Sequence, residues 1–189
     1  MLRKCLCACS VASVLFLTPA GFARAQDTSD AEDRVQELLA ELAEPGQEDW
    51  RRIENEIAGI WSRSGSRSMD LLLMRGKKAI EEGRIDEAVE HFSALTDHAP
   101  DFAEGWNARA TAFFLMEEYS LSIMDVERTL ALNPDHFGAL SGLATMFEIM
   151  DEPDLALQAL REVQRINPNR PETDEAILRL ERSRGEVDL

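Results

Sequence analysis

Cysteine is almost absent from this 189-residue sequence: its three cysteines, Cys5, Cys7 and Cys9, all fall within the first ten residues. Residues 10–189 therefore contain no thiol that could form a disulfide, act as a nucleophile or ligate zinc. Cysteine chemistry is excluded for nearly the whole chain.

Basic residues are also scarce. Lysine and arginine number 20 against 36 aspartate and glutamate residues, which gives a net charge of −16 at neutral pH. Nucleic acids and anionic membranes attract proteins mainly through lysine and arginine, so this balance argues against both as partners. We expect no nucleic-acid binding.

The usual catalytic motifs are missing too. The sequence has no glycine-rich phosphate loop, no G-x-S-x-G turn and no H-E-x-x-H pair. We predict no enzymatic activity, no cofactor and no metal site. His98 and His136 stand beside Asp97 and Asp135; we interpret them as exposed polar residues at repeat junctions, and a metal or proton site is the alternative.

The first 25 residues have the pattern of a secretory signal peptide. Arg3 and Lys4 precede an apolar run from Cys5 to about Phe22, and a small-x-small site ends at Ala25. We predict cleavage after Ala25 and a periplasmic or secreted protein, with no stable membrane insertion after cleavage. A retained membrane anchor is the alternative. Cleavage removes three basic residues and no acidic one, so the mature chain is more acidic still.

A spacing of 34 residues recurs in the rest of the chain, where Pro100, Pro134 and Pro168 follow one another at that interval. A proline inside a helix costs about 3 kcal/mol, so these prolines mark helix ends. They divide the chain into frames 69–102, 103–136 and 137–170. The eighth position of each frame is small and the fourth is large and apolar: Gly76, Ala110 and Ala144, and Leu72, Trp106 and Leu140.

This combination of period, small positions and terminal proline resembles the tetratricopeptide repeat family, including small exported bacterial members of unassigned activity. The resemblance covers residues 69–170 and implies an all-α fold, a solenoid of antiparallel helix pairs. The small eighth residue of each frame is where the two helices of a pair approach closely.

The flanking segments are predicted to be helical as well. Residues 26–68 predict an N-terminal helical hairpin, a degenerate or capping repeat, with helices over about 29–44 and 47–63 separated by Pro45 and Gly46. Residues 171–189 predict a C-terminal capping helix and tail. Repeat arrays need such ends because an open end exposes an apolar face.

The turn inside each repeat is less uniform in sequence. Gly83 suits a left-handed turn in the first repeat. Glu117 and Asp151 stand at the equivalent positions and predict tighter or less regular turns. In the second repeat we expect the guanidinium of Arg109 to meet a junction carboxylate such as Asp101.

The family resemblance also implies a concave groove lined by the first helix of each repeat. Carried over position by position, the expected partner-binding residues are Asp70, Leu73, Lys77, Glu104, Asn107, Thr111, Phe114, Ser141, Thr145 and Glu148. Asn107 is the best placed, because an amide can bond both polar groups of a peptide backbone. Some family members hold a C-terminal carboxylate with several lysines and arginines. That set is absent here, so we expect a neutral to basic polypeptide partner.

The leading hypothesis is an exported protein–protein interaction scaffold. One alternative for the groove is that the terminal helices fold back and fill it. A second functional hypothesis is a self-associating structural module of the cell envelope, motivated by Trp50, Trp61 and the leucines of 35–42. A third is an enzyme or metal-binding protein. The sequence predicts no oligomeric state.

Overall fold

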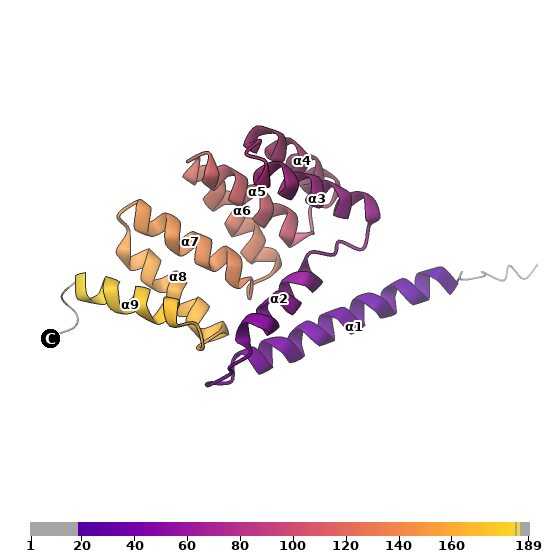
Figure 1. Cartoon of the computed structure of the whole chain (residues 1–189). Helices are drawn as coiled ribbons and strands as arrows, with labels where there is room; N and C mark the ends of the chain where they lie inside the picture. Colours follow the sequence, from indigo (N-terminus) through magenta and orange to yellow (C-terminus); the bar gives the residue numbers. More distant parts are fainter. Residues whose placement is uncertain (1–18, 184, 186–189) are drawn as a thin grey trace, which may run out of the picture.

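The computed structural model describes the backbone of residues 19–183 and 185, and the side chains of residues 30–183 and 185. Within these residues there are nine α-helices and no strands, which confirms the all-α prediction (Figure 1). The helices are α1 (Pro19–Leu42), α2 (Trp50–Trp61), α3 (Arg67–Glu81), α4 (Ile85–His98), α5 (Ala103–Leu115), α6 (Tyr119–Leu132), α7 (Phe137–Ile149), α8 (Pro153–Ile166) and α9 (Pro171–Ser183). None of the helices in this part of the chain is long and apolar enough to cross a membrane.

Helices α3 to α8 form three antiparallel pairs, one for each 34-residue frame. The small eighth positions lie where the helices of a pair touch. A Cβ atom on Gly76 would lie 2.2 Å from the ring of Phe92, which is fully buried. In the second pair, Ser122 of α6 donates a buried hydrogen bond of 2.7 Å to the carbonyl of Ala110. Larger residues at these positions would force the helices apart.

The turns inside the three repeats have the same shape, so the prediction of tighter or less regular turns at Glu117 and Asp151 was wrong. Gly83, Glu117 and Asp151 all adopt a left-handed backbone, with φ of 74°, 60° and 58°. Each turn is closed by the same backbone bond from the next residue to a carbonyl five positions earlier, as from Glu118 to Phe113 at 2.9 Å. The same local backbone bond thus closes the turn even where glycine is missing.

The C-terminal helix α9 covers the end of the array, as predicted. Ile177 and Leu180 belong to one buried cluster with Leu157 and Leu160 of α8. Outside the cluster, Arg161 of α8 pairs with a carboxylate of α9. The apolar face of the last repeat is therefore covered, which an array needs to remain soluble.

The N-terminal hairpin forms as predicted but lies in an unexpected place. A capping repeat would stack on α3, ahead of the first repeat. Instead, Ile53 and Ile57 of α2 share a buried core with Phe137 of α7 and Val163 of α8. The hairpin therefore folds back onto the third repeat, and Trp50, only 7% exposed, lies within that core.

One side chain fixes the tip of this hairpin to the far end of the array. Asn169, in the loop after α8, accepts hydrogen bonds from the amides of Gly46 and Gln47 at 2.8 and 3.1 Å. Its amide group donates to the carbonyls of Leu42 and Glu44 at 2.9 and 3.0 Å. Asn169 thus satisfies backbone groups that α1 leaves free at its end.

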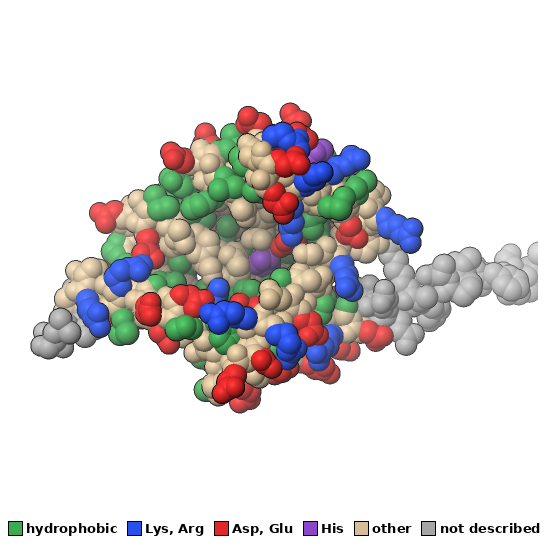
Figure 2. Space-filling view, in the orientation of Figure 1, with side chains coloured by type: hydrophobic (Ala, Val, Ile, Leu, Met, Phe, Trp, Pro, Cys, Tyr) green, Lys and Arg blue, Asp and Glu red, His purple; other side chains and the backbone are tan. Residues whose placement is uncertain are grey.

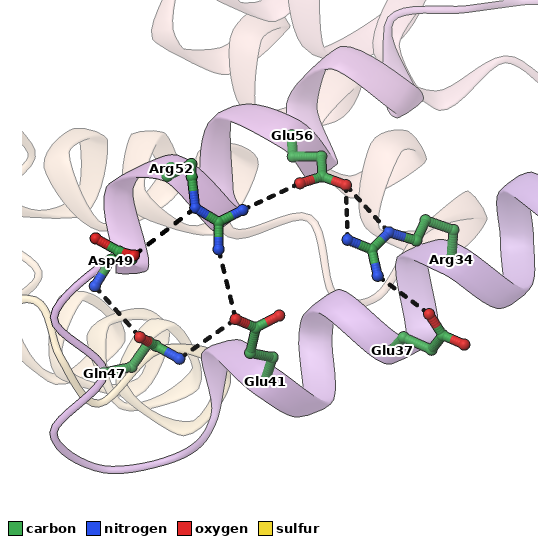
Figure 3. Close-up of polar contacts among 7 residues, drawn as sticks. All are labelled: Arg34, Glu37, Glu41, Gln47, Asp49, Arg52 and Glu56. Carbon is green, nitrogen blue, oxygen red and sulfur yellow. Dashed lines mark hydrogen bonds and ion pairs between the residues drawn. The ribbon is translucent and has the colours of Figure 1, made fainter.

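A polar network joins the two helices of the hairpin on its exposed side (Figure 3). Glu56 of α2 accepts from Arg34 of α1 at 2.9 Å and from Arg52 at 3.3 Å. Arg52 also lies 3.5 Å from Glu41 of α1. Exposed pairs of this kind contribute about 0–1 kcal/mol each, so the buried core holds the hairpin and the network sets its alignment.

Helix α1 begins ten residues before the predicted start at Ser29, and its backbone continues through Ala25. Residues 1–18, which hold most of the predicted signal peptide, lie outside the described residues. The predicted cleavage site falls within the first turns of α1, whereas the hairpin core begins later, at Leu38.

Candidate protein-binding groove

A pocket of about 190 Å³ opens between α5 and α7 on the face formed by the first helices of the repeats. Four of the predicted partner-binding residues line it: Asn107, Thr111, Phe114 and Thr145. They come from two repeats, so the 34-residue register brings them together. Thr111 and Thr145 are exposed at the rim, and their hydroxyl groups bond back to the helix carbonyls of Asn107 and Ser141.

Helix α7 contributes small residues to the lining of this pocket. Gly138 and Gly142 form part of the wall, and Ala110, Val126 and Met146 form an apolar floor. Gly142 was not among the predicted site residues. Its spacing of one helical turn from Gly138 is the signal that could have revealed it, since residues four apart share a helix face.

The predicted residues on α3 lie apart from this pocket. Asp70, Leu73 and Lys77 line a separate open hollow of about 490 Å³, and Leu73 is at the same time buried in the core of the first repeat. Asp70 accepts hydrogen bonds from the backbone amide and hydroxyl of Ser64 at 2.8 and 2.6 Å. This predicted site residue holds the linker between α2 and α3.

Glu104 of the second repeat connects the first repeat to the start of α7. Its carboxylate lies 2.7 Å from Lys77 of the first repeat and 3.2 Å from Asn107 of the second repeat. It also lies 3.2 Å from His136, the last residue of the second frame and the N-cap of α7. Burial alone would raise the pKa of Glu104. The hydrogen bond from His136 and the charge of Lys77 outweigh that effect and lower the pKa below its ordinary value.

His136 is a buried residue, only 5% exposed, so its interpretation as an exposed junction residue was wrong. Its Nδ1 accepts the backbone N–H of Ala139 at 3.1 Å and caps α7. The Nε2 atom therefore carries the hydrogen and donates a hydrogen bond to the carboxylate of Glu104. One face of the imidazole ring stacks on the indole ring of Trp61, the last residue of α2.

The remaining predicted residues, Ser141 and Glu148 of α7, are engaged by the C-terminal segment. Arg170 donates to the hydroxyl of Ser141 at 3.1 Å, and Arg179 of α9 pairs with Glu148. The terminal segments therefore contact both ends of α7, the hairpin at His136 and α9 at Glu148. The alternative of a filled groove applies to these flanks, whereas the pocket between α5 and α7 is open within residues 30–183 and 185.

Arg109 makes a different ion pair from the predicted one. Its guanidinium donates to both carboxylate oxygens of Asp125 at 2.7 and 2.8 Å, and its side chain is only 17% exposed. Asp101, the expected partner, is exposed and lies 3.6 Å from Arg128 instead. The ring of Trp106 covers the Arg109 guanidinium at 4.9 Å. The pair links α5 to α6 behind the pocket.

No group of three or more histidine, cysteine, aspartate or glutamate side chains within residues 30–183 and 185 is arranged to hold a metal ion. Glu104 and His136 are hydrogen-bonded to each other, and each has a further partner, Lys77 for Glu104 and the backbone N–H of Ala139 for His136.

Residues 73–128 match the family model described as a tetratricopeptide repeat. A tetratricopeptide repeat-containing protein of Rhizobium etli is 38% identical to this chain over 133 residues, which are 70% of this chain. The chain belongs to the tetratricopeptide repeat superfamily. It spans 65% of the length of that bacterial tetratricopeptide relative.

Solved tetratricopeptide structures share the fold. The first such domain of Spaghetti (RPAP3), bound to the HSP90 peptide SRMEEVD, has a TM-score of 0.60 and 21% identity, over 64% of this chain and 95% of that chain. The Yersinia enterocolitica type III secretion chaperone SycD, in complex with a peptide of the translocator YopD, has a TM-score of 0.59 and 15% identity, over 63% of this chain and 96% of that chain. At these identities the similarity concerns the fold alone.

Proposed function

We propose that this tetratricopeptide protein is an interaction scaffold that binds a partner polypeptide in the pocket between α5 and α7, and that it is not an enzyme. The observation that carries the proposal is the convergence of Asn107, Thr111 and Thr145 from two repeats on one apolar pocket. The Spaghetti domain and the Yersinia chaperone each hold a peptide, which supports a polypeptide as the ligand.

The pocket favours an apolar side chain followed by peptide backbone. Its floor is apolar, and its volume of about 190 Å³ suits one large side chain. The amide nitrogen of Asn107 already donates to Glu104. We therefore expect the side-chain carbonyl oxygen of Asn107 to accept a hydrogen bond from a backbone N–H of the bound segment.

The charges beside the pocket favour a neutral to basic segment. Lys77, the one lysine among the predicted groove residues, is paired with Glu104. Capture of a free carboxylate would require that pair to break, which leaves Glu104 buried without its lysine. We therefore do not extend to this chain the binding of an acidic peptide such as SRMEEVD.

The test is a peptide selection on the immobilised protein, followed by affinity measurements with two matched variants. Thr111→Arg places a long side chain over the pocket, whereas Ser120→Arg places the same side chain on the exposed start of α6. We expect the first variant to weaken binding of the selected peptides about tenfold or more and the second to leave it unchanged. Equal affinities for all three proteins would overturn the assignment of this pocket.

We also propose that the protein is exported, on the basis of the signal-peptide pattern in residues 1–25. Fractionation of bacterial cells producing the full chain, with N-terminal sequencing of the product, tests this. Recovery outside the cytoplasm with Gln26 as the first residue is expected. A cytoplasmic product that retains residues 1–25 would contradict export.

A further inference from the structure

Exposed apolar side chains gather at one edge of the array. Of the ten exposed large hydrophobic residues in the described part of the chain, six lie beside the turns between α5 and α6 and between α7 and α8. We call them the turn-edge strip: Leu115, Met116, Leu121, Ile149, Met150 and Leu155. Their exposure ranges from 40% to 50%. Single exposed hydrophobic residues are normal on a protein surface, but a cluster of this kind marks an interaction site.

The strip is repeated by the fold itself. Its members form three pairs separated by one repeat length, as Met116 and Met150 do, so equivalent side chains stand on adjacent repeats. The first repeat has glutamate at all three of these places: Glu81, Glu82 and Glu87. The apolar surface is therefore confined to the second and third repeats.

Acidic residues surround the strip. The two turns carry Glu117, Glu118, Asp151 and Glu152, and none of these side chains lies within 4 Å of a basic group among residues 30–183 and 185. Figure 2 shows green and red side chains side by side along the left margin, where Figure 1 places both turns. Lysine or arginine on a partner would gain ion pairs with these free carboxylates.

The backbone of this edge is already bonded. The amides of Glu117 and Glu118 donate to Phe114 and Phe113, and those of Asp151 and Glu152 to Glu148 and Phe147. An extended segment could not use these amides to satisfy its own backbone. A helix satisfies its backbone internally and presents only side chains.

We infer that the turn-edge strip is a second interaction surface, which binds a basic amphipathic helix of a partner protein. The apolar face of the bound helix covers the six apolar residues of the strip, and the lysines or arginines of the helix reach the flanking carboxylates. A second copy of this chain would bring two acidic edges together, and an anionic membrane would meet the same repulsion. The surface lies at the ends of α5 and α7, beyond the pocket of the proposed function.

The probe is a synthetic helical peptide with leucine on one face and lysine on the other, tested against the full chain by fluorescence anisotropy. The variant Leu121→Gln with Leu155→Gln alters the strip at residues 42% and 41% exposed. The control is Leu71→Gln with Leu178→Gln, at residues 40% and 44% exposed elsewhere on the molecule. We expect the strip variant to bind about tenfold more weakly and the control to bind like the wild type.

Two further binding measurements complete the test. A peptide with glutamate in place of lysine is expected to bind at least about tenfold more weakly. The pocket variant Thr111→Arg is expected to bind the helical peptide normally, which separates this surface from the proposed function. Failure of the lysine peptide to bind, equal loss in the strip and control variants, or dimerisation or vesicle binding abolished only in the strip variant would overturn the inference.

Discussion

The indole ring of Trp61 stacks on the imidazole ring of His136, with centroids 4.8 Å apart and an angle of 23° between the planes. The two residues are 75 positions apart, and their contact joins the hairpin to the start of α7. Phe137 completes the contact at 5.2 Å from Trp61. Because His136 also donates a hydrogen bond to Glu104, the hairpin is coupled to the side chain that pairs with Lys77 of the first repeat.

Trp61→Ala is expected to release the C-terminal end of α2 from α7 and to lower the free energy of unfolding by about 3 kcal/mol. Amide hydrogen exchange should accelerate in α1 and α2 and change little in α3 and α4. Removing the exposed Met74, which lies on α3, with Met74→Ala is the control and should leave exchange unchanged. Uniformly faster exchange through the whole chain would show that Trp61 supports the array rather than the hairpin.

Glu104→Gln is expected to remove an acid-dependent part of the stability. The pKa of Glu104 is lowered in the folded protein from an ordinary value of about 4.3, so the unfolded chain binds more protons between the two values. The stabilisation is therefore complete above about pH 4.3 and is lost as the pH falls through the folded pKa. Urea unfolding at several pH values should show a flatter acid limb for Glu104→Gln. The exposed Glu90→Gln should retain the wild-type profile.

Asp125→Leu is expected to lower the free energy of unfolding by about 3–5 kcal/mol, because Arg109 would keep a largely buried charge without its partner. Adding Arg109→Met to Asp125→Leu should recover part of the lost stability, because the double variant contains no unpaired buried charge at this place. A double-mutant cycle by chemical denaturation measures the coupling. Strictly additive losses would mean that the ion pair does not act as a unit.

Glu117→Gly and Asp151→Gly are each expected to raise the free energy of unfolding by about 1 kcal/mol, because a left-handed backbone is costly for residues with a Cβ atom. Gly83→Glu should lower it by a similar amount. The control is Glu118→Gly, at a residue whose φ is −83°. That substitution should bring no gain. Thermal unfolding followed by circular dichroism measures these changes. Equal stabilisation by Glu118→Gly and Glu117→Gly would show that the left-handed backbone of Glu117 is not the cause.

Sequence reasoning located the helix pairs because their determinants are local and periodic. Pro100, Pro134 and Pro168 end helices wherever they occur, and the frames that they define agree with the starts of α5 and α7. The same register placed Asn107, Thr111 and Thr145 on one face, and the structure brings them to one pocket. The turn at Glu117 was misjudged because a left-handed backbone is costly but not forbidden for a residue with a Cβ atom.

The sequence by itself determined the repeat period, the close contact at Gly76, the helical hairpin and the C-terminal cap, because each depends on neighbours within a few helical turns. Only the tertiary structure decided where the hairpin docks, that His136 is buried, and that Arg109 pairs with Asp125. The hydrogen bonds of Asn169 to the hairpin tip span 122 to 127 residues. Contacts at that separation depend on which apolar surfaces meet after the array has formed, and no local spacing encodes that choice.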